Sequence, residues 1–159
     1  MINGFKGEYE FLSNFFRYPI VWKNMILPSA EHAYQSEKTT DENERFAIYT
    51  AFLPADAKRL GSPRKLKHLK PRWDALKDDV MLNVLRAKFS DPDLKKALLE
   101  TGDHRLIEAN WWGDIYWGVS NGFGKNRLGE LLMKVRDELK KGIDNGLMER
   151  YAEYSRRDH

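Results

Sequence analysis

Apolar residues recur at three- and four-residue steps in two long stretches, and this spacing constrains the fold more than any other feature. In the stretch that ends at Phe89, the residues that keep this step are Val80, Met81, Val84 and Leu85. In the second stretch, Lys125–Lys140, they are Leu128, Leu131, Leu132, Val135 and Leu139. Such spacing places apolar side chains on one face of an α-helix. The sequence therefore predicts two amphipathic helices, the first beginning at Pro71 or Asp74.

Capping signals predict shorter helices elsewhere. The expected helices run from Pro28-Ser29 to about Lys38, from Thr40 or Asp41 to about Phe52 with Glu44 as capping-box partner, from Pro54 to Gly61, and from Asp91-Pro92 to Thr101-Gly102. Residues 5–27 are expected to form short extended pieces and turns. Residues 105–121 are expected to form an extended segment or hairpin followed by a loop.

These elements predict a mainly α fold with irregular aromatic-rich loops and little β structure. The length of 159 residues suits one domain. We expect that domain to span 1–142, followed by a charged extension, 143–159, with a short helix over about 145–154. Because the chain has no cysteine, disulfides and thiolate metal sites are excluded. No signal peptide or membrane span is visible, so we expect a cytoplasmic protein that does not contact membranes.

Polar residues on the early predicted helix share one side of it. Glu31, Gln35 and Lys38 stand at i, i+4 and i+7 and form a stripe that Tyr34 flanks. An exposed ion pair would explain this stripe. The functional interpretation is that the stripe lines a pocket. His32 points to another face and is interpreted as structural.

Acids and aromatic rings alternate in the segment from Leu106 to Gly118. Glu108 and Asp114 lie among three tryptophans and a tyrosine. Acids in apolar surroundings tend to have raised pKa values, which suit proton transfer near neutrality. The alternative is a structural loop in which these acids cap backbone amides.

Three further features have two interpretations each. Trp73 is either a core anchor or a plate on which a base stacks. Ser13 and Asn14 either bond local backbone or hydrogen-bond a ligand. The run from Lys58 to Arg72 has seven Lys and Arg residues and no acid, which predicts either a solvated loop or a positive field for phosphates or nucleic acid.

Gly122–Arg127 precedes the last long helix, and glycines there let backbone amides approach an anion, although a plain turn and cap fits equally well. No metal-binding motif is present in the sequence. We expect neither a metal nor another cofactor.

Taken together and in this order, these segments resemble the NADAR family, also described as YbiA-like. Two departures are the Lys-rich loop at 62–70 and Glu37, where the family more usually has a small residue. The matching pieces, which cover about residues 5–140, are Phe5 with Glu10–Phe15, Ser29–Gln35 with Lys38, Ala55–Gly61, Trp73-Asp74, Val80–Phe89, Leu98–Asp103, Leu106–Glu108, Asp114 with Trp117-Gly118, and Gly124–Arg136.

The resemblance implies a single compact YbiA-like domain with an aromatic pocket that hydrolyses an N-glycosidic bond. Two substrate classes are implied. One is a phosphorylated ribosyl-base intermediate of riboflavin synthesis, and the other is ADP-ribose attached to guanine, free or in nucleic acid. The oligomeric state stays open.

On this hypothesis Glu31 is the catalytic carboxylate, with Asp114 or Glu108 as the second acid. Lys38 would contact the ribose or a leaving-group atom, or trap an opened sugar as a Schiff base. Trp73 and Trp117 would stack on base or sugar, and Ser13 and Asn14 would bond sugar hydroxyls. Lys125, Asn126 and Arg127 would hold phosphate at a helix start. The remaining predicted substrate-binding residues are Tyr34, Gln35 and Gly118.

Two rival classes remain. A binding module could recognise ADP-ribose or NAD without cleaving it. A plain nucleic-acid-binding domain would bind more weakly as salt rises, but its motif signatures are absent from the sequence.

Overall fold

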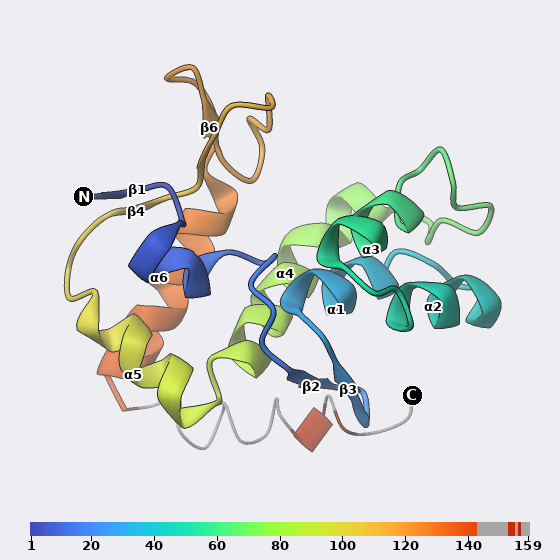
Figure 1. The fold of residues 1–159 in the computed structure, drawn as a ribbon, viewed down its shortest axis with the longest axis horizontal. Helices are drawn as coiled ribbons and strands as arrows, with labels where there is room; N and C mark the ends of the chain where they lie inside the picture. Colours follow the sequence, from blue (N-terminus) through green and yellow to red (C-terminus); the bar gives the residue numbers. More distant parts are fainter. Residues whose placement is uncertain (143–152, 155, 157–159) are drawn as a thin grey trace.

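Helices dominate the chain, and the strands are only two or three residues long (Figure 1). The structure, a computed structural model, describes residues 1–142, 153, 154 and 156. The mainly α expectation is confirmed, whereas the terminal helix expected over 145–154 falls almost wholly outside the described residues. The elements are β1 (Ile2–Asn3), the 3-10 helix η1 (Gly7–Leu12), β2 (Ile20–Trp22), β3 (Met25–Leu27), α1 (Ala30–Ser36), α2 (Glu42–Tyr49), α3 (Pro54–Leu60), α4 (Trp73–Lys88), α5 (Pro92–Glu100), β4 (Leu106–Ile107), β5 (Ala109–Asn110), β6 (Val119–Ser120) and α6 (Arg127–Lys140).

The two long amphipathic helices, α4 and α6, pack against each other as their apolar spacing requires. Val84 and Leu85 of α4 and Leu132 and Val135 of α6 are fully buried. Burying a side chain of this size stabilises the fold by about 1.5–3 kcal/mol. No helix in the described part of the chain is both long and apolar enough to cross a membrane.

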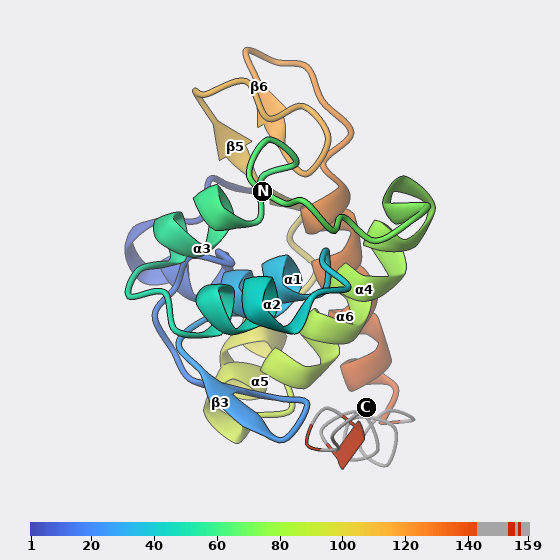
Figure 2. The ribbon, with the colours of Figure 1, turned by 90° about the vertical axis from the view of Figure 1, so that its right-hand side faces the viewer.

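Helix α1 lies at the centre of the molecule. It contacts α2, α3, α4 and the β2–β3 pair, and each of its seven residues is buried. Figures 1 and 2 show α1 enclosed by these elements, with the β5–β6 segment set apart at the top of the view. Polar residues on such a helix need internal partners or a cavity, because unpartnered burial of a polar group is costly.

The amino-terminal segment differs in part from the sequence expectation. Residues 7–12 form a 3-10 helix rather than an extended piece, and this tight turn brings Leu12 into the core. β2 and β3 pair antiparallel, and positive φ angles at Lys23 and Asn24 make the connecting turn the primed type that two-residue hairpins favour. β1 pairs parallel with β4, which places the amino terminus beside residues 106–107.

Of the two alternatives expected for 105–121, the hairpin is wrong, because β5 and β6 run parallel, and the extended segment followed by a loop describes β4, β5 and the loop to β6. The side chain of Asn110 bonds both backbone polar groups of Asp114, accepting from its N–H at 2.9 Å and donating to its carbonyl at 2.8 Å. These bonds fold the chain back inside the loop, so it enters β6 in the same direction as β5.

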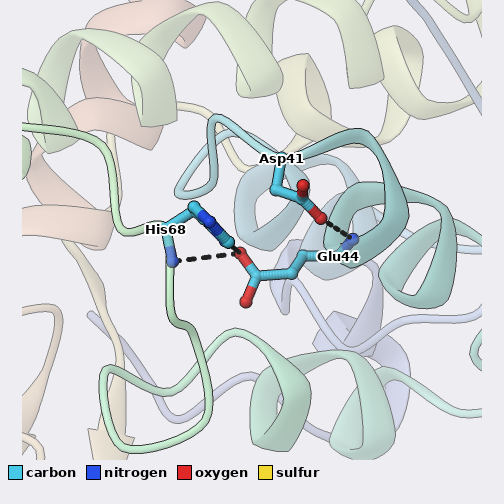
Figure 3. Close-up of side chains that lie close together, drawn as sticks. All are labelled: Asp41, Glu44 and His68. Atoms are coloured by element: carbon cyan, nitrogen blue, oxygen red, sulfur yellow. Dashed lines mark hydrogen bonds and ion pairs between the residues drawn. The ribbon is translucent and has the colours of Figure 1, made fainter.

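Glu44 on α2 holds the basic loop that follows α3 (Figure 3). Its carboxylate accepts hydrogen bonds from the backbone amides of Lys67 at 2.7 Å and His68 at 3.2 Å, and from the Thr39 hydroxyl at 2.6 Å. The expected capping box is therefore half formed. Asp41 caps α2 by accepting a hydrogen bond from the Glu44 amide, whereas the Glu44 side chain accepts hydrogen bonds from the loop.

Replacing Glu44 by Gln should lower the free energy of unfolding by about 1–3 kcal/mol at pH 7, because an amide cannot replace the charged acceptor of three hydrogen bonds. The Thr39 hydroxyl, the two loop amides and His68 lower the pKa of Glu44. Its contribution should therefore be complete above about pH 4.5 and be lost as pH falls through the folded-state value. Urea unfolding at pH 7 and pH 3 measures both effects.

The exposed Glu42, on the same helical turn, provides the control. Glu42→Gln should change the free energy of unfolding by less than about 0.5 kcal/mol. Equal effects of the two substitutions, or a Glu44→Gln deficit that persists undiminished at pH 3, would contradict the role assigned to Glu44.

Candidate active site

A cavity of about 530 Å³ lies between α1, α3, α4, α6 and the segment 106–118. This volume is typical of small-molecule sites, which span roughly 300–1,000 Å³. Its walls combine aromatic and aliphatic side chains with acids and two amines. The lining residues are Ser13, Asn14, Phe15, Glu31, Tyr34, Gln35, Lys38, Ala55, Lys58, Met81, Glu108, Trp112, Asp114, Trp117 and Leu128.

Helix α1 supplies a polar wall. Glu31, Gln35 and Lys38 line the cavity, and the Gln35 amide donates to Glu31 Oε1 at 2.8 Å. Glu31 is only 6% exposed, so the alternative of an exposed ion pair is wrong. His32 faces away from this wall, bonding Ser29 Oγ at 2.7 Å and the Ala51 carbonyl at 2.9 Å, so it is structural.

The Ser13-Asn14 loop forms a second wall and is tied to two helices. The Asn14 carbonyl accepts from the Glu31 amide at 3.1 Å, and the Ser13 carbonyl accepts from Lys88 Nζ at 2.9 Å. The Asn14 side-chain oxygen is buried without a hydrogen-bond partner. An unsatisfied acceptor at a cavity is a position that a ligand hydroxyl or N–H can satisfy.

The segment 106–118 brings Glu108, Asp114 and Trp117 to the cavity. Asp114 Oδ1 accepts from the backbone amides of Tyr116 at 3.1 Å and Trp117 at 2.9 Å. The structural-capping alternative therefore describes Asp114, although this residue also faces the cavity. Glu108 differs, because its Oε2 is buried without a hydrogen-bond partner.

Burial separates the acids of the cavity from ordinary carboxylates. It raises the pKa of Glu108 to about 7, with the negative charges of Asp114 and Glu31 adding to the effect. Burial also raises the pKa of Glu31, and the Gln35 hydrogen bond and the nearby amines of Lys58 and Lys38 only partly offset this rise. The cavity thus holds at least one acid that can carry a proton near neutrality.

Lys38 stands beside an aromatic wall. Its Nζ lies 5.4 Å from the centroid of the Tyr34 ring, which meets Trp117 edge-on at 5.6 Å between centroids. Burial lowers the pKa of Lys38, and the charges of Lys58 and Lys77 lower it further, against the opposing effect of Glu31. The amine is thus easier to deprotonate than a solvated lysine.

Two predicted binding residues support the site from outside the cavity. Trp73 is buried behind Tyr34, with ring centroids 5.5 Å apart, so it is a core anchor rather than an open stacking plate. A Cβ on Gly118 would lie 2.2 Å from the Glu108 carbonyl oxygen. Gly118 is thus required for the close approach of two backbone segments.

The three residues at the start of α6 that were predicted to bind phosphate do not line the cavity. Asn126 uses its side chain to accept from the Glu108 amide at 2.9 Å and to donate to the Leu106 carbonyl at 2.9 Å. Arg127 Nε pairs with Asp78 Oδ2 at 3.1 Å, and Lys125 is exposed. Of the turn-and-cap alternative, only the turn describes this segment, because the Asn126 side chain does not cap α6 and instead holds the Glu108 backbone in place.

Sequence reasoning missed several residues at or near the site. Lys58 and Trp112 line the cavity, although each lies in a segment that the sequence marked as basic or Trp-rich. Lys88 was also missed, and it is buried with only 4% of its surface exposed. Its signal was its position seven residues after Met81, which places a lysine on the apolar face of α4.

One group of potential metal ligands occurs among the described residues, and it lies apart from the cavity lining. It consists of Asp41, Glu44 and His68 (Figure 3). The Asp41 and Glu44 carboxylates already accept the helix-capping and loop hydrogen bonds described above. This group is therefore explained as a loop clamp.

Comparisons with known proteins place this geometry in a family. The NADAR domain matches residues 4–140. The chain is 40% identical over 134 residues to N-glycosidase YbiA of Escherichia coli (strain K12), covering 83% of this chain and 82% of that protein. The chain belongs to the NADAR domain family.

Two further similarities agree with that assignment. The NMR structure of the E. coli protein YbiA superposes with a TM-score of 0.78 at 36% identity, covering 90% of this chain and 89% of that one. The riboflavin biosynthesis protein VVA0006 of Vibrio vulnificus is 34% identical over 89% of this chain, which corresponds to 39% of its own length. The YbiA-like fold expected from the sequence is confirmed.

The buried amine of Lys88 gives a measurable pH effect. Burial lowers its pKa to about 7, with Glu108 opposing the shift. Between that value and the unfolded value near 10.5, the unfolded chain binds more protons, so stability should rise with pH. Lys88→Met should remove this rise, so the wild type should gain free energy of unfolding relative to the variant as pH goes from 7 to 10.

Urea unfolding across this pH range makes the measurement, with Lys134→Met at an exposed position of α6 as the control. The control should follow the wild type at every pH. Parallel curves for the wild type and Lys88→Met would show that Lys88 is not a buried, readily deprotonated amine.

Proposed function

We propose that this protein is an N-glycosidase that hydrolyses the bond between a ribose C1 atom and a nitrogen base. One observation carries the proposal: a single cavity holds Glu31, Glu108 and Asp114 beside Lys38 among aromatic rings. Cleaving a C–N glycosidic bond builds positive charge on the sugar and negative charge on the departing base. This reaction needs both a carboxylate and a protonated acid, and the cavity offers both kinds of group.

Glu31 is the carboxylate of this proposal. Its Oε1 is fixed by Gln35, and the amines of Lys58 and Lys38 favour its ionised form against the effect of burial. An ionised Glu31 beside C1 stabilises the oxocarbenium-like transition state and orients the attacking water. Because the group is buried, its charge acts in a medium that screens it weakly.

Glu108 is the acid that protonates the departing base. A pKa of about 7 leaves a large fraction of the group protonated at neutral pH, and its Oε2 has no partner in the protein. The charge of Asp114 sustains this protonation. Two neighbouring acids with different environments thus take opposite roles, as in many glycosidases.

Lys38 and the aromatic side chains hold the substrate in this proposal. Lys38 hydrogen-bonds a ribose hydroxyl or a leaving-group atom, with Schiff-base capture of an opened sugar as the alternative route. Trp117 and Trp112, the latter half exposed at 53%, provide faces on which the base stacks. Asn14, with its unsatisfied oxygen, and Ser13 accept hydrogen bonds from sugar hydroxyls.

The proposed substrate is a phosphorylated ribosyl-base intermediate of riboflavin synthesis, in a cytoplasmic setting. The name of the Vibrio vulnificus relative supports this choice. ADP-ribose on guanine is the second candidate, favoured by the exposed basic residues Arg64, Lys65 and Lys67 on the loop after α3. The alternative is a module that binds ADP-ribose or NAD without cleaving it, and such a module would return the ligand intact in a product analysis.

Glu31→Gln should leave the fold intact, because the amide keeps the shape and the Gln35 contact, while turnover falls by about 100-fold or more. Mass spectrometry of products from a panel of riboflavin intermediates and ADP-ribosyl nucleosides measures the loss of turnover and identifies the base.

Glu37→Gln provides a matched control. Glu37 is buried at the end of α1 but bonds Trp22 and Lys23 and does not line the cavity. Replacing its carboxylate should therefore leave turnover unchanged. Unchanged turnover in Glu31→Gln would remove Glu31 from the mechanism.

The pH profile tests Glu108. Because the acid form is needed, kcat/KM of the wild type should fall as pH rises through about 7. Glu108→Gln should lose about 100-fold or more in turnover and show no such fall. A wild-type profile flat from pH 6 to pH 9, or full activity in Glu108→Gln, would assign the proton transfer to another group.

A further inference from the structure

The cavity has a cation at its edge to which the proposed function assigns no contact with the substrate. Ala55 and Lys58 stand three residues apart on α3, and both line the cavity. Their neighbours turn elsewhere, since Arg59 pairs with Asp56 at 3.9 Å. The face of α3 toward the cavity therefore presents one amine.

Lys58 has no ion pair with a carboxylate among the described residues. Its ammonium lies 5.7 Å from the centroid of the Phe15 ring, itself part of the lining. By contrast, Lys70 and Lys77, two other basic residues near the site, pair with Glu37 and Asp74. Lys58 is thus an exposed charge at the cavity with no carboxylate partner in the part of the chain that the structure describes.

The charge of Lys58 affects the pKa values of the groups proposed to act at C1. It lowers the pKa of Glu31 and of Glu108 against the stronger effect of burial, and it contributes to the lowered pKa of Lys38. Because Lys58, Glu31, Glu108 and Lys38 line one cavity, a ligand that fills it can contact Lys58 and these groups at the same time.

An anionic ligand group must avoid the acids, because like charges repel and the cavity already holds three carboxyl groups. In a ribose 5-phosphate unit, the phosphate is attached at C5, away from C1. With that phosphate on Lys58, the C1 end of the sugar is left to the part of the cavity that Glu31 and Glu108 line. The start of α6, where the sequence suggested a phosphate site, is occupied by the protein's own contacts.

We infer that Lys58 forms a phosphate subsite that recognises the 5-phosphoryl group of the ribose and sets the direction in which the sugar enters. This inference rests on the proposed function for the identity of the sugar. The same chemistry is present in ribose 5-phosphate and in the diphosphate of ADP-ribose. An experiment with separate ligands distinguishes the two sources.

Calorimetric titration of the full chain with ribose, ribose 5-phosphate and ADP-ribose tests binding without requiring turnover. Lys58→Gln should weaken binding of the phosphorylated ligand about tenfold or more and leave ribose binding unchanged. Lys58→Arg should retain most of the affinity. Arg59→Gln, the control at the neighbouring α3 position that does not line the cavity, should stay within about twofold of the wild type.

Kinetics provide the second measurement. Lys58→Gln should raise KM more for a phosphorylated N-riboside than for the dephosphorylated riboside. Because the Lys58 charge also favours the ionised form of Glu31, the change in kcat should be the same for both substrates. If the wild type cleaves N-ribosides but Lys58→Gln binds ribose 5-phosphate and ADP-ribose normally, the subsite is overturned and the proposed function stands. If the wild type binds ribose 5-phosphate through Lys58 but cleaves no riboside, the proposed function fails and the subsite stands. Failure of the wild type to bind either phosphorylated ligand overturns the subsite.

Discussion

Complete burial of α1 is the constraint on which the rest of the structure depends. A buried helix that carries Glu31 and Gln35 is stable only if these groups meet partners or an internal cavity. Here the Gln35 amide donates a hydrogen bond to Glu31, and the side chains of both residues face the cavity. The surrounding helices therefore pack against α1 while leaving one polar side of it unfilled. The same burial raises the pKa of Glu31, so the fold and the chemistry have a common cause.

Anchored loops complete the cavity, and their anchors are buried polar contacts rather than sheet structure. Lys88 holds the Ser13 carbonyl from α4, and Asn126 holds the Glu108 amide from the start of α6. Such contacts are costly to leave unpaired inside a protein, which makes them effective at fixing one loop geometry. A fold with strands of two or three residues can in this way position acids from distant segments. These anchor residues do not touch the cavity, yet they decide where its acids lie.

The electrostatic design places acids and amines in one confined space. Burial, together with the negative charges of Asp114 and Glu31, raises the pKa of Glu108 to about 7, while the amines of Lys38 and Lys58 favour the ionised form of Glu31. Neither carboxylate would have this behaviour on an open surface. The chain's NADAR membership and this arrangement support the same proposed reaction from independent directions. In the proposed reaction, the aromatic rings around the acids have two roles, because they exclude water and provide flat faces on which a base stacks.

Local sequence determined the helices, because the spacing of apolar residues and the caps at Asp41, Asp91 and Gly61 act within a few residues of one another. It also determined that Glu31 and Gln35 share one side of α1, since helix periodicity alone sets that relation, whereas Lys38 lies in the turn after the helix. Tertiary structure decided what the spacing could not. It made β5 and β6 parallel and paired the Asn126 side chain with the Glu108 backbone amide. It also placed Lys58 at the cavity and buried Lys88 in the core. Each of these outcomes depends on partners far away in the chain, and no local pattern encodes which distant group will satisfy a buried polar atom.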